Sequence, residues 1–192
     1  MKQLNENIFH QYNKWKKNYV RKENSVKVKI NEFLSRRPFY KDFFSISDDE
    51  TCVNSSTSVF IYDDDLIDGK IPFQFGKVDG SFNCSACTGL ISLEGVPKTV
   101  SRKFFCDECS KLTSLKGAPK TVGNNFKCSH CGNLTSLEGA PEKVGGSFSC
   151  EGCPNLTSLE HLPNEINGII KVDKRFEGQI PSDKKILKIR FK

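Results

Sequence analysis

Residues 75–163 contain four copies of one 22-residue phrase, and this repeat constrains the fold more than any other feature of the chain. Identical residues at a fixed short period are typical of a solenoid, in which each repeat forms one coil of a stack. The sequence therefore predicts an elongated repeat structure. The recurring positions are Phe82, Phe104, Phe126 and Phe148; Cys84, Cys106, Cys128 and Cys150; Cys87, Cys109, Cys131 and Cys153; Leu90, Leu112, Leu134 and Leu156; Leu93, Leu115, Leu137 and Leu159; Pro97, Pro119, Pro141 and Pro163.

Within one copy, the pattern predicts a strand that leads into the first cysteine. Apolar and polar residues alternate through 145–150, which would place Phe148 and Cys150 on one face of a half-buried strand. We expect Val144 on the same inward side and a second short strand over Leu156–Leu159. One coil alone buries too little apolar surface to fold, so the coils must stack and the ends of the stack must be capped.

Degenerate copies of the phrase predict caps on both sides of the repeat. On the N-terminal side, we expect Phe60 and Tyr62 to occupy the places of Phe82 and Cys84 one period later. On the C-terminal side, Ile166, Ile170 and Val172 would take the Val, Phe and first Cys places of a fifth copy. The segment 186–191 is expected to close the sheet as a strand with Lys and Arg on its outer side, which blunts edge-to-edge aggregation.

The run from Phe126 to Leu137 and the phrase Leu134–Pro141 resemble the leucine-rich repeats of the BspA-like type. The phrase is similar to repeats of many uncharacterised bacteriophage and bacterial proteins, and the resemblance covers about residues 58–172. It implies a parallel β-solenoid with an interaction surface, and no catalytic residues come with it. Two departures are the extra cysteine of each pair and a Gly where an aliphatic residue usually follows the second Leu.

The repeat and this resemblance together predict a mainly β protein. We expect a leucine-rich-repeat-like parallel β-solenoid of 22-residue coils with an N-terminal α-helical region. The expected regions are a basic helical segment over 1–50, a degenerate capping coil over 51–80, the repeat solenoid over 81–165, and a capping coil with the closing strand over 166–192.

Eight of the nine cysteines form four Cys-x-x-Cys pairs, with 18 residues between one pair and the next. This spacing is within the range of a zinc ribbon. The alternative is a pair of cysteine ladders in the core, because free Cys is a small, readily buried residue. We favour the ladders, since the pairs keep step with Phe, Leu and Pro, and since Tyr62 and Val172 replace the first cysteine in the caps. We therefore predict no cofactor, with zinc as the alternative; its ligands would be Cys84, Cys87, Cys106 and Cys109 in one site and Cys128, Cys131, Cys150 and Cys153 in another.

The net charge of +6 is divided unevenly along the chain. Residues 1–42 carry 11 Lys and Arg against 4 Asp and Glu, and residues 171–192 carry 8 against 3. Basic ends of this kind bind polyanions or an acidic body. No apolar run approaches the roughly 20 residues of a membrane helix, and the start lacks the apolar stretch of a secretory signal. We therefore expect a cytoplasmic protein, in the host cytoplasm if the chain is encoded by a bacteriophage.

The N-terminal region has the spacing of an amphipathic helix, because Leu4, Ile8, Tyr12, Trp15 and Tyr19 fall on one face. This helix either caps the first coil or binds nucleic acid or a partner groove. A second apolar cluster is expected to pack under it. The basic cluster consists of Lys14, Lys16, Lys17, Arg21 and Lys22; the apolar cluster consists of Phe33, Leu34, Phe39, Tyr40, Phe43 and Phe44.

The remaining polar residues show no catalytic pattern. Asp63–Asp65 and Asp68 lack the ligand pattern of an EF-hand and are expected in a turn. No phosphate loop, nucleophile elbow or paired catalytic carboxylates are present, so we expect no enzyme activity. Variable outward positions are the expected contact sites, while the Thr and Ser pairs are expected to bond along the stack. The candidate contact residues are Arg102, Lys103, Phe105, Lys127 and His130.

The sequence thus predicts a non-enzymatic protein-protein interaction module with an unidentified partner, and a bacteriophage protein that acts on a host factor is one form of it. The alternatives are a nucleic-acid-binding protein that uses its basic ends and a structural zinc protein. Salt dependence separates the first alternative from protein binding, because affinity for nucleic acid falls steeply with salt.

Overall fold

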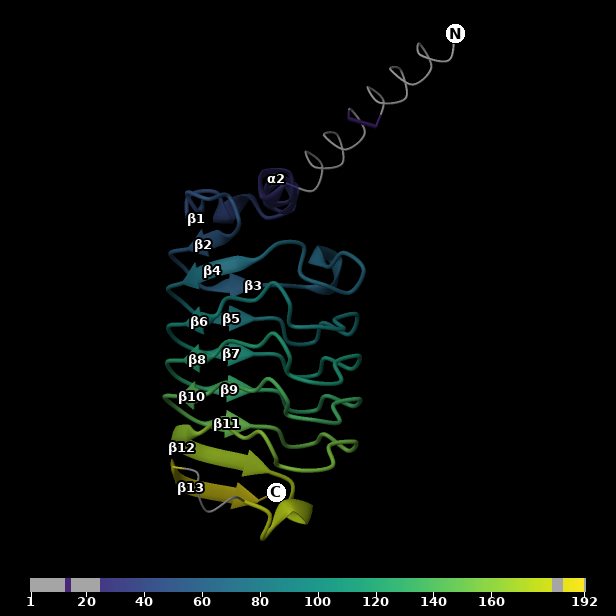
Figure 1. Cartoon of the computed structure of the whole chain (residues 1–192), viewed down its shortest axis with the longest axis vertical. Helices are drawn as coiled ribbons and strands as arrows, with labels where there is room; N and C mark the ends of the chain where they lie inside the picture. The colour runs from purple at the N-terminus through teal and green to yellow at the C-terminus, as the bar shows by residue number, and fades with distance from the viewer. Residues whose placement is uncertain (1–12, 15–24, 181–184, 192) are drawn as a thin grey trace.

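The computed structural model, which describes residues 13–14, 25–180 and 185–191, is a parallel β-solenoid of about six coils of roughly 22 residues with a short N-terminal helix (Figure 1). The predicted mainly β solenoid is therefore confirmed. The helical elements are α2 (Val26–Arg36) and the 3-10 helices η1 (Pro38–Tyr40), η2 (Asp63–Asp65) and η3 (Lys174–Phe176). The strands are β1 (Phe44–Ile46), β2 (Val53–Ser55), β3 (Val59–Phe60), β4 (Phe75–Val78), β5 (Phe82–Asn83), β6 (Thr99–Val100), β7 (Phe104–Phe105), β8 (Thr121–Val122), β9 (Phe126–Lys127), β10 (Lys143–Val144), β11 (Phe148–Ser149), β12 (Glu165–Val172) and β13 (Lys185–Phe191).

Each regular coil contributes two short strands, one ending at the recurring Val and one beginning at the recurring Phe. In one column Val100 pairs with Val122, and in the other Phe104 pairs with Phe126, both parallel and one period apart. The long strand β12 pairs with both β10 and β11, so the two columns join in one 13-stranded sheet. All these pairings repeat at the period read from the sequence.

The predicted strand over Leu156–Leu159 is wrong. This segment and its equivalents in the other coils carry no strand, although neighbouring coils share single bonds there, such as Thr135 N–H to Thr113 C=O (3.0 Å). Leu156 and Leu159 are nonetheless buried. Two inward residues three positions apart do not fit the two-residue period of a strand. The expected bonding along the stack is confirmed for Thr135 and Thr157, which donate their hydroxyls to the preceding coil's carbonyl. It is wrong for Ser136 and Ser158, whose hydroxyls accept from N–H groups two residues later in the same coil.

The core consists of aligned columns of identical side chains. The rings of Phe82, Phe104, Phe126 and Phe148 stack with centroids 5.2–5.8 Å apart and planes within 12° of parallel. All four are 0% exposed. The glycine of the Gly-Ala-Pro turn permits this close stacking, since Gly139 has φ +88° and a Cβ there would lie 2.6 Å from the backbone of the preceding coil.

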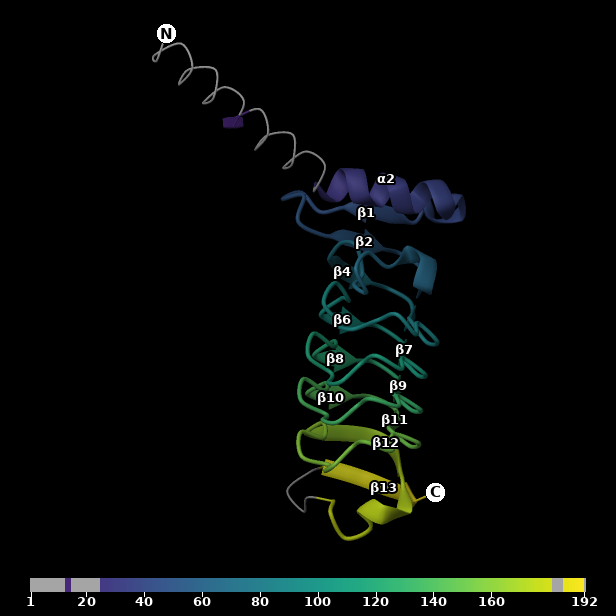
Figure 2. The ribbon, with the colours of Figure 1, turned by 90° about the vertical axis from the view of Figure 1, so that its right-hand side faces the viewer.

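The helix α2 lies across the N-terminal end of the solenoid (Figure 2). Ser25 caps it by accepting from Val28 N–H at 3.3 Å. Its buried Phe33 contacts the rings of Tyr40, Phe44 and Phe73, and an aromatic series continues from there into the Phe column. The helix expected over residues 4–19 lies outside the described residues, apart from Asn13 and Lys14, which are helical.

The apolar cluster after this helix is only partly buried. Phe33 and Tyr40 are buried, and Leu34 and Phe44 pack against the core. Phe39 and Phe43, which we expected in the same cluster, are instead 63% and 47% exposed. That expectation is wrong. The segment buries only one of its faces, and Phe39 and Phe43 lie on the other, exposed face.

The register of the N-terminal cap also differs from the expectation by one residue. Val59 pairs with Phe82, and Phe60 pairs with Asn83, so the step is 23 residues rather than 22. Val59 and Ile61 are buried in the Phe and Cys columns, whereas Phe60 and Tyr62 are exposed. The additional residue lies between Ile61 and Gly69, since Gly69 and Ile91 bond at the ordinary spacing. The helix η2 occupies this stretch.

The C-terminal cap follows the expected register. Ile166 pairs with Val144 and Ile170 with Phe148, and Val172 is buried. Strand β13 then pairs in parallel with β12, as expected for a closing strand. In the described residues, no helix is long and apolar enough to cross a membrane.

Candidate partner-binding surface

The repeat cysteines form two buried columns in which the thiols face backbone carbonyls. The second cysteine of each pair donates to the preceding coil, as in Cys109 Sγ to Cys84 O and Cys131 Sγ to Cys106 O, both at 3.2 Å. Cys84, Cys106 and Cys128 donate to the following coil, as in Cys106 Sγ to Lys127 O at 3.4 Å. All eight are free and 0–1% exposed, and Cys52 is partly exposed. Over the described ranges, no cluster of three or more His, Cys, Asp or Glu side chains is placed to hold a metal ion.

Burial controls the chemistry of these thiols. It raises the pKa of Cys106, Cys128 and Cys150 well above the ordinary value, and it raises the pKa of Cys87 to about 12. These thiols are therefore protonated at neutral pH. A nucleophilic cysteine needs a thiolate and access, and neither condition is met here.

The predicted contact residues lie on the outer face of the Phe column. Lys127 Nζ sits 5.4 Å from the ring centroid of Phe105, so the structure brings these two side chains together. Arg102 and Lys103 are exposed in the turn before β7, and His130 is exposed at the corner of the next coil. Lys14 is helical and exposed. The other basic residues of that cluster, Lys16, Lys17, Arg21 and Lys22, lie outside the described residues.

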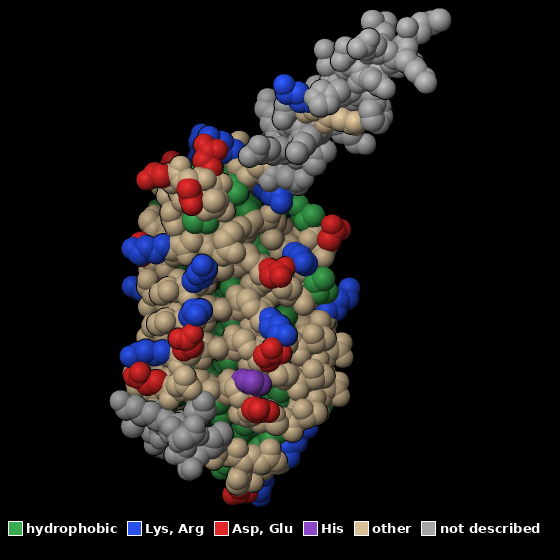
Figure 3. Space-filling model, viewed as in Figure 1, with side chains coloured by type: hydrophobic (Ala, Val, Ile, Leu, Met, Phe, Trp, Pro, Cys, Tyr) green, Lys and Arg blue, Asp and Glu red, His purple; other side chains and the backbone are tan. Residues whose placement is uncertain are grey.

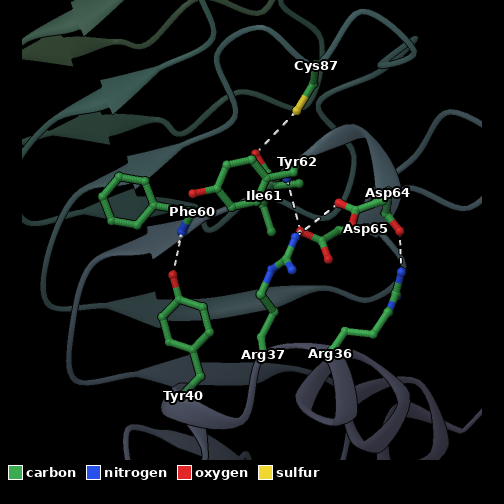
Figure 4. A network of polar contacts seen from close by, with 9 residues as sticks. All are labelled: Arg36, Arg37, Tyr40, Phe60, Ile61, Tyr62, Asp64, Asp65 and Cys87. Atoms are coloured by element: carbon green, nitrogen blue, oxygen red, sulfur yellow. Dashed lines mark hydrogen bonds and ion pairs between the residues drawn. The ribbon is translucent and has the colours of Figure 1, made fainter.

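A buried ion pair links the N-terminal cap to the first coil, and sequence reasoning did not predict it. Arg37, which follows α2, bonds through Nη2 to Asp65 Oδ2 at 3.2 Å and to Asp64 Oδ1 at 3.0 Å (Figure 4). Asp65 is 0% exposed and also accepts from Tyr62 N–H at 3.0 Å. Asp65 belongs to η2, so the pair lies in the stretch that holds the additional residue of this coil.

The same junction fixes the aromatic side chains around it. The Arg37 guanidinium carbon lies 4.8 Å from the ring centroid of Tyr62, and the Tyr40 hydroxyl accepts from Phe60 N–H at 2.8 Å. This second bond satisfies the amide on the open edge of β3. The rings of Phe39 and Tyr40 lie 4.1 Å apart. The backbone and side chains on this face are therefore held in place by buried contacts.

Exposed aromatic side chains gather at this junction. Phe39, Phe60 and Tyr62 are 63%, 42% and 53% exposed. Arg37, Phe39, Tyr62 and Asp64 line a hollow of about 420 Å³. We call the surface formed by Arg37, Phe39, Phe60, Tyr62 and Asp64 the cap surface. Green hydrophobic side chains reach the exterior beside charged ones near this end of the molecule (Figure 3).

Exposed apolar residues are otherwise rare on the described surface. Six of its eight exposed large apolar side chains precede residue 70, and the other two are Ile91 and Ile189. Contiguous exposed apolar surface marks interaction sites, whereas single exposed residues do not. The cap surface is therefore the strongest candidate site on the part of the molecule that is described.

Asp63 has a structural role in the same turn. Its carboxylate accepts from Gly89 N–H at 2.9 Å and from Thr88 N–H and hydroxyl at 3.1 and 2.8 Å. These bonds lower the pKa of Asp63. The acidic run, which we expected in a simple turn, thus has one member bonded to the next coil, one buried against Arg37 and one exposed in the cap surface.

The fold and this surface define a parallel β-solenoid repeat protein with an aromatic site at its N-terminal cap. No protein-family model matches the chain, and the searches of curated proteins and of solved structures found no significant match.

Proposed function

We propose that this chain is a non-enzymatic protein-binding module whose partner docks on the cap surface. The observation that carries the proposal is the clustering of three exposed aromatic rings around the buried Arg37–Asp65 pair. Aromatic side chains and Arg dominate the energetic centres of protein interfaces. A protein partner is the ligand that such a surface suits best.

Preorganisation supports the proposal. A loose surface loses affinity, because each side chain that becomes immobilised on binding costs about 0.5–1.5 kcal/mol. Here Arg37 is only 19% exposed and is bonded to two carboxylates, and it lies against the Tyr62 ring. Tyr62 is therefore already restricted in the free protein, so its immobilisation on binding costs less conformational entropy.

The thiols support a role without catalysis. The repeat cysteines are buried, and the raised pKa values of Cys87, Cys106, Cys128 and Cys150 keep these four thiols protonated at neutral pH. In this position they act as core residues. The bonds between thiols and backbone carbonyls also argue against the zinc alternative, because zinc ligands would be thiolates turned away from those carbonyls.

Two competing surfaces are distinguished by their chemistry. The Phe105–Lys127 pair is a second protein-binding candidate, but Phe105 is only partly exposed and Lys127 covers its ring. Nucleic acid would need a cationic surface, whereas residues 63–68 of the cap carry four Asp and no Lys or Arg. The resemblance of the repeat phrase to bacteriophage and bacterial proteins is the support for a partner from a bacterial host cytoplasm.

Competitive capture from a nuclease-treated bacterial lysate tests the proposal. The bait is the full chain in three forms: unchanged, with Phe39→Ala and Tyr62→Ala, and with Phe105→Ala and Lys127→Ala. We expect a protein that is retained by the first and third forms and lost from the second, and that then binds the purified unchanged chain directly. Equal recovery on all three forms contradicts the proposal, as does a retained species whose binding requires nucleic acid and falls steeply with salt.

A further inference from the structure

We propose that the cap surface takes a lysine or arginine side chain carried on an extended apolar segment of its partner. This inference rests on the proposed function and names the chemistry that the same site recognises. It is drawn from the shape of the hollow, from its aromatic walls and from the unequal use of its charges.

The hollow has two exposed aromatic walls. Phe39 and Tyr62 line it, with 63% and 53% of their surface accessible. Phe60 is exposed at the end of β3, two residues before Tyr62, and extends the aromatic surface beyond the hollow. A cation held over an aromatic face gains roughly 0.5–1 kcal/mol at an exposed site and about 2 or more when desolvated.

The charges around the hollow favour a cation over an anion. Arg37 is already paired with two carboxylates, so its charge is compensated. The Asp64 carboxylate accepts from Arg37 at 3.0 Å and keeps 66% of its side chain exposed. Asp64 and Arg37 line the hollow, and the buried Asp65 lies against Arg37. These three side chains carry two carboxylates and one guanidinium, so together they are net negative by one formal charge.

The arginines at this site already contact other groups of the protein. Arg36 donates through Nη1 to the backbone carbonyl of Asp64, and Arg37 is mostly buried beneath Tyr62. An acidic peptide in the hollow would meet the exposed Asp64 carboxylate and an Arg37 that is already paired with two carboxylates. A basic side chain would instead meet two aromatic rings and an exposed carboxylate, with apolar neighbours placed against Phe60.

Selection from a display library of random peptides tests this recognition directly. The target is the immobilised full chain, and peptides that also bind the Phe39→Ala and Tyr62→Ala double variant are removed. We expect the surviving peptides to carry Lys or Arg beside apolar residues. Synthetic copies should bind Asp64→Asn about tenfold more weakly than the unchanged chain, which corresponds to about 1.4 kcal/mol.

Three variants make the result specific. Asp64→Asn removes the charge but keeps an acceptor oxygen for Arg37, and Tyr62→Leu keeps an apolar side chain but removes the ring. Asp68→Asn is the matched control, because it makes the same charge change at an exposed residue of the same turn that does not line the hollow. We expect weaker binding in the first two and unchanged binding in the control, with equal thermal unfolding of all three.

The outcomes separate this inference from the proposed function. Peptides that bind the cap surface but lack Lys and Arg, or that are insensitive to Asp64→Asn, overturn the basic-residue inference and leave the protein-binding surface in place. If every selected peptide binds the double variant equally well, the cap surface is not the site and both proposals are wrong.

Discussion

The regular coils over 81–165 and the N-terminal cap over 25–72 are built on opposite principles. In the coils, one residue type fills each inward position, and the Phe rings stack within 12° of parallel. In the cap, the angle between neighbouring ring planes varies, from 11° for Phe33 and Phe44 to 88° for Phe33 and Phe73 at the boundary with the first coil. The cap also buries an ion pair, and it exposes the aromatic side chains that the coils conceal.

This difference shows that the residues of the coils and those of the cap serve different purposes. Repetition gives coils that support one another, so that each inward side chain serves stability. A cap has no neighbour on one side, and its residues satisfy the open edge of the sheet and remain available for contact. We therefore assign the scaffold role to the regular coils and the partner site to the N-terminal cap, where the repeat pattern breaks.

The largest expected effect is loss of the coils at alkaline pH. A thiol whose pKa is raised by folding stabilises the fold below the ordinary thiol pKa of about 8.5, and this contribution disappears as the pH rises through the folded value. For Cys106, Cys128 and Cys150 we expect each thiol to cost about 2 kcal/mol at pH 10. Urea unfolding followed by circular dichroism at neutral pH and at pH 10 measures the combined loss.

A matched pair of variants assigns this alkaline effect to the core. Cys106→Val should reduce the dependence on pH, because a valine already fills this column at Val172. Cys52→Val, which lies outside the repeat, should leave it unchanged. A pH dependence that is equal in both variants would show that the core thiols do not cause it.

The next effect compares one substitution in the two regions. Phe126→Ala removes a fully buried ring with two stacked neighbours and should cost about 3–5 kcal/mol of unfolding free energy. Phe39→Ala removes an exposed ring and should change the unfolding free energy by roughly 0.5 kcal/mol or less. Chemical denaturation measures both, and similar values would contradict the division between core and surface.

Breaking the buried pair of the cap should have an intermediate effect. Asp65→Ala leaves Arg37 mostly buried with a single exposed carboxylate partner, and we expect a loss of about 3 kcal/mol, at the low end of the range for buried pairs since Arg37 is partly exposed. Replacing both partners, in Arg37→Met with Asp65→Leu, should recover most of that loss. Hydrogen exchange should place the destabilisation in 25–72, and uniform loss across the coils would contradict a local role.

The smallest expected effect is that of metal removal. The thiols donate to carbonyls in neighbouring coils, so chelation should leave the unfolding midpoint unchanged. Metal analysis of protein purified with zinc present should find far less than one equivalent per chain. Near two equivalents, together with unfolding on chelation, would restore the zinc sites as the correct interpretation.

The coils could be predicted from sequence because the period is invariant and its inward residues are unmistakable. The register of the cap could not be predicted, because Val59, Phe60, Ile61 and Tyr62 are all apolar. Alternation of apolar and polar residues identifies the inward face of a strand, and here there is no such alternation. The three-residue spacing of Leu156 and Leu159 already argued against a strand. The Arg37–Asp65 pair joins residues that are 28 positions apart in the sequence, and no local sequence pattern indicates such a contact.

The central claim is that the coils are a scaffold and the cap surface is the site. It is tested most directly by removing one complete coil, residues 119–140, so that Ala118 is joined to Pro141 and the repeat phrase stays continuous. The binding affinity of this shortened chain for the captured partner should equal that of the full chain, once circular dichroism has shown that the solenoid is folded. Loss of binding in a folded, shortened chain with the cap intact would contradict the claim and place the site on the coils.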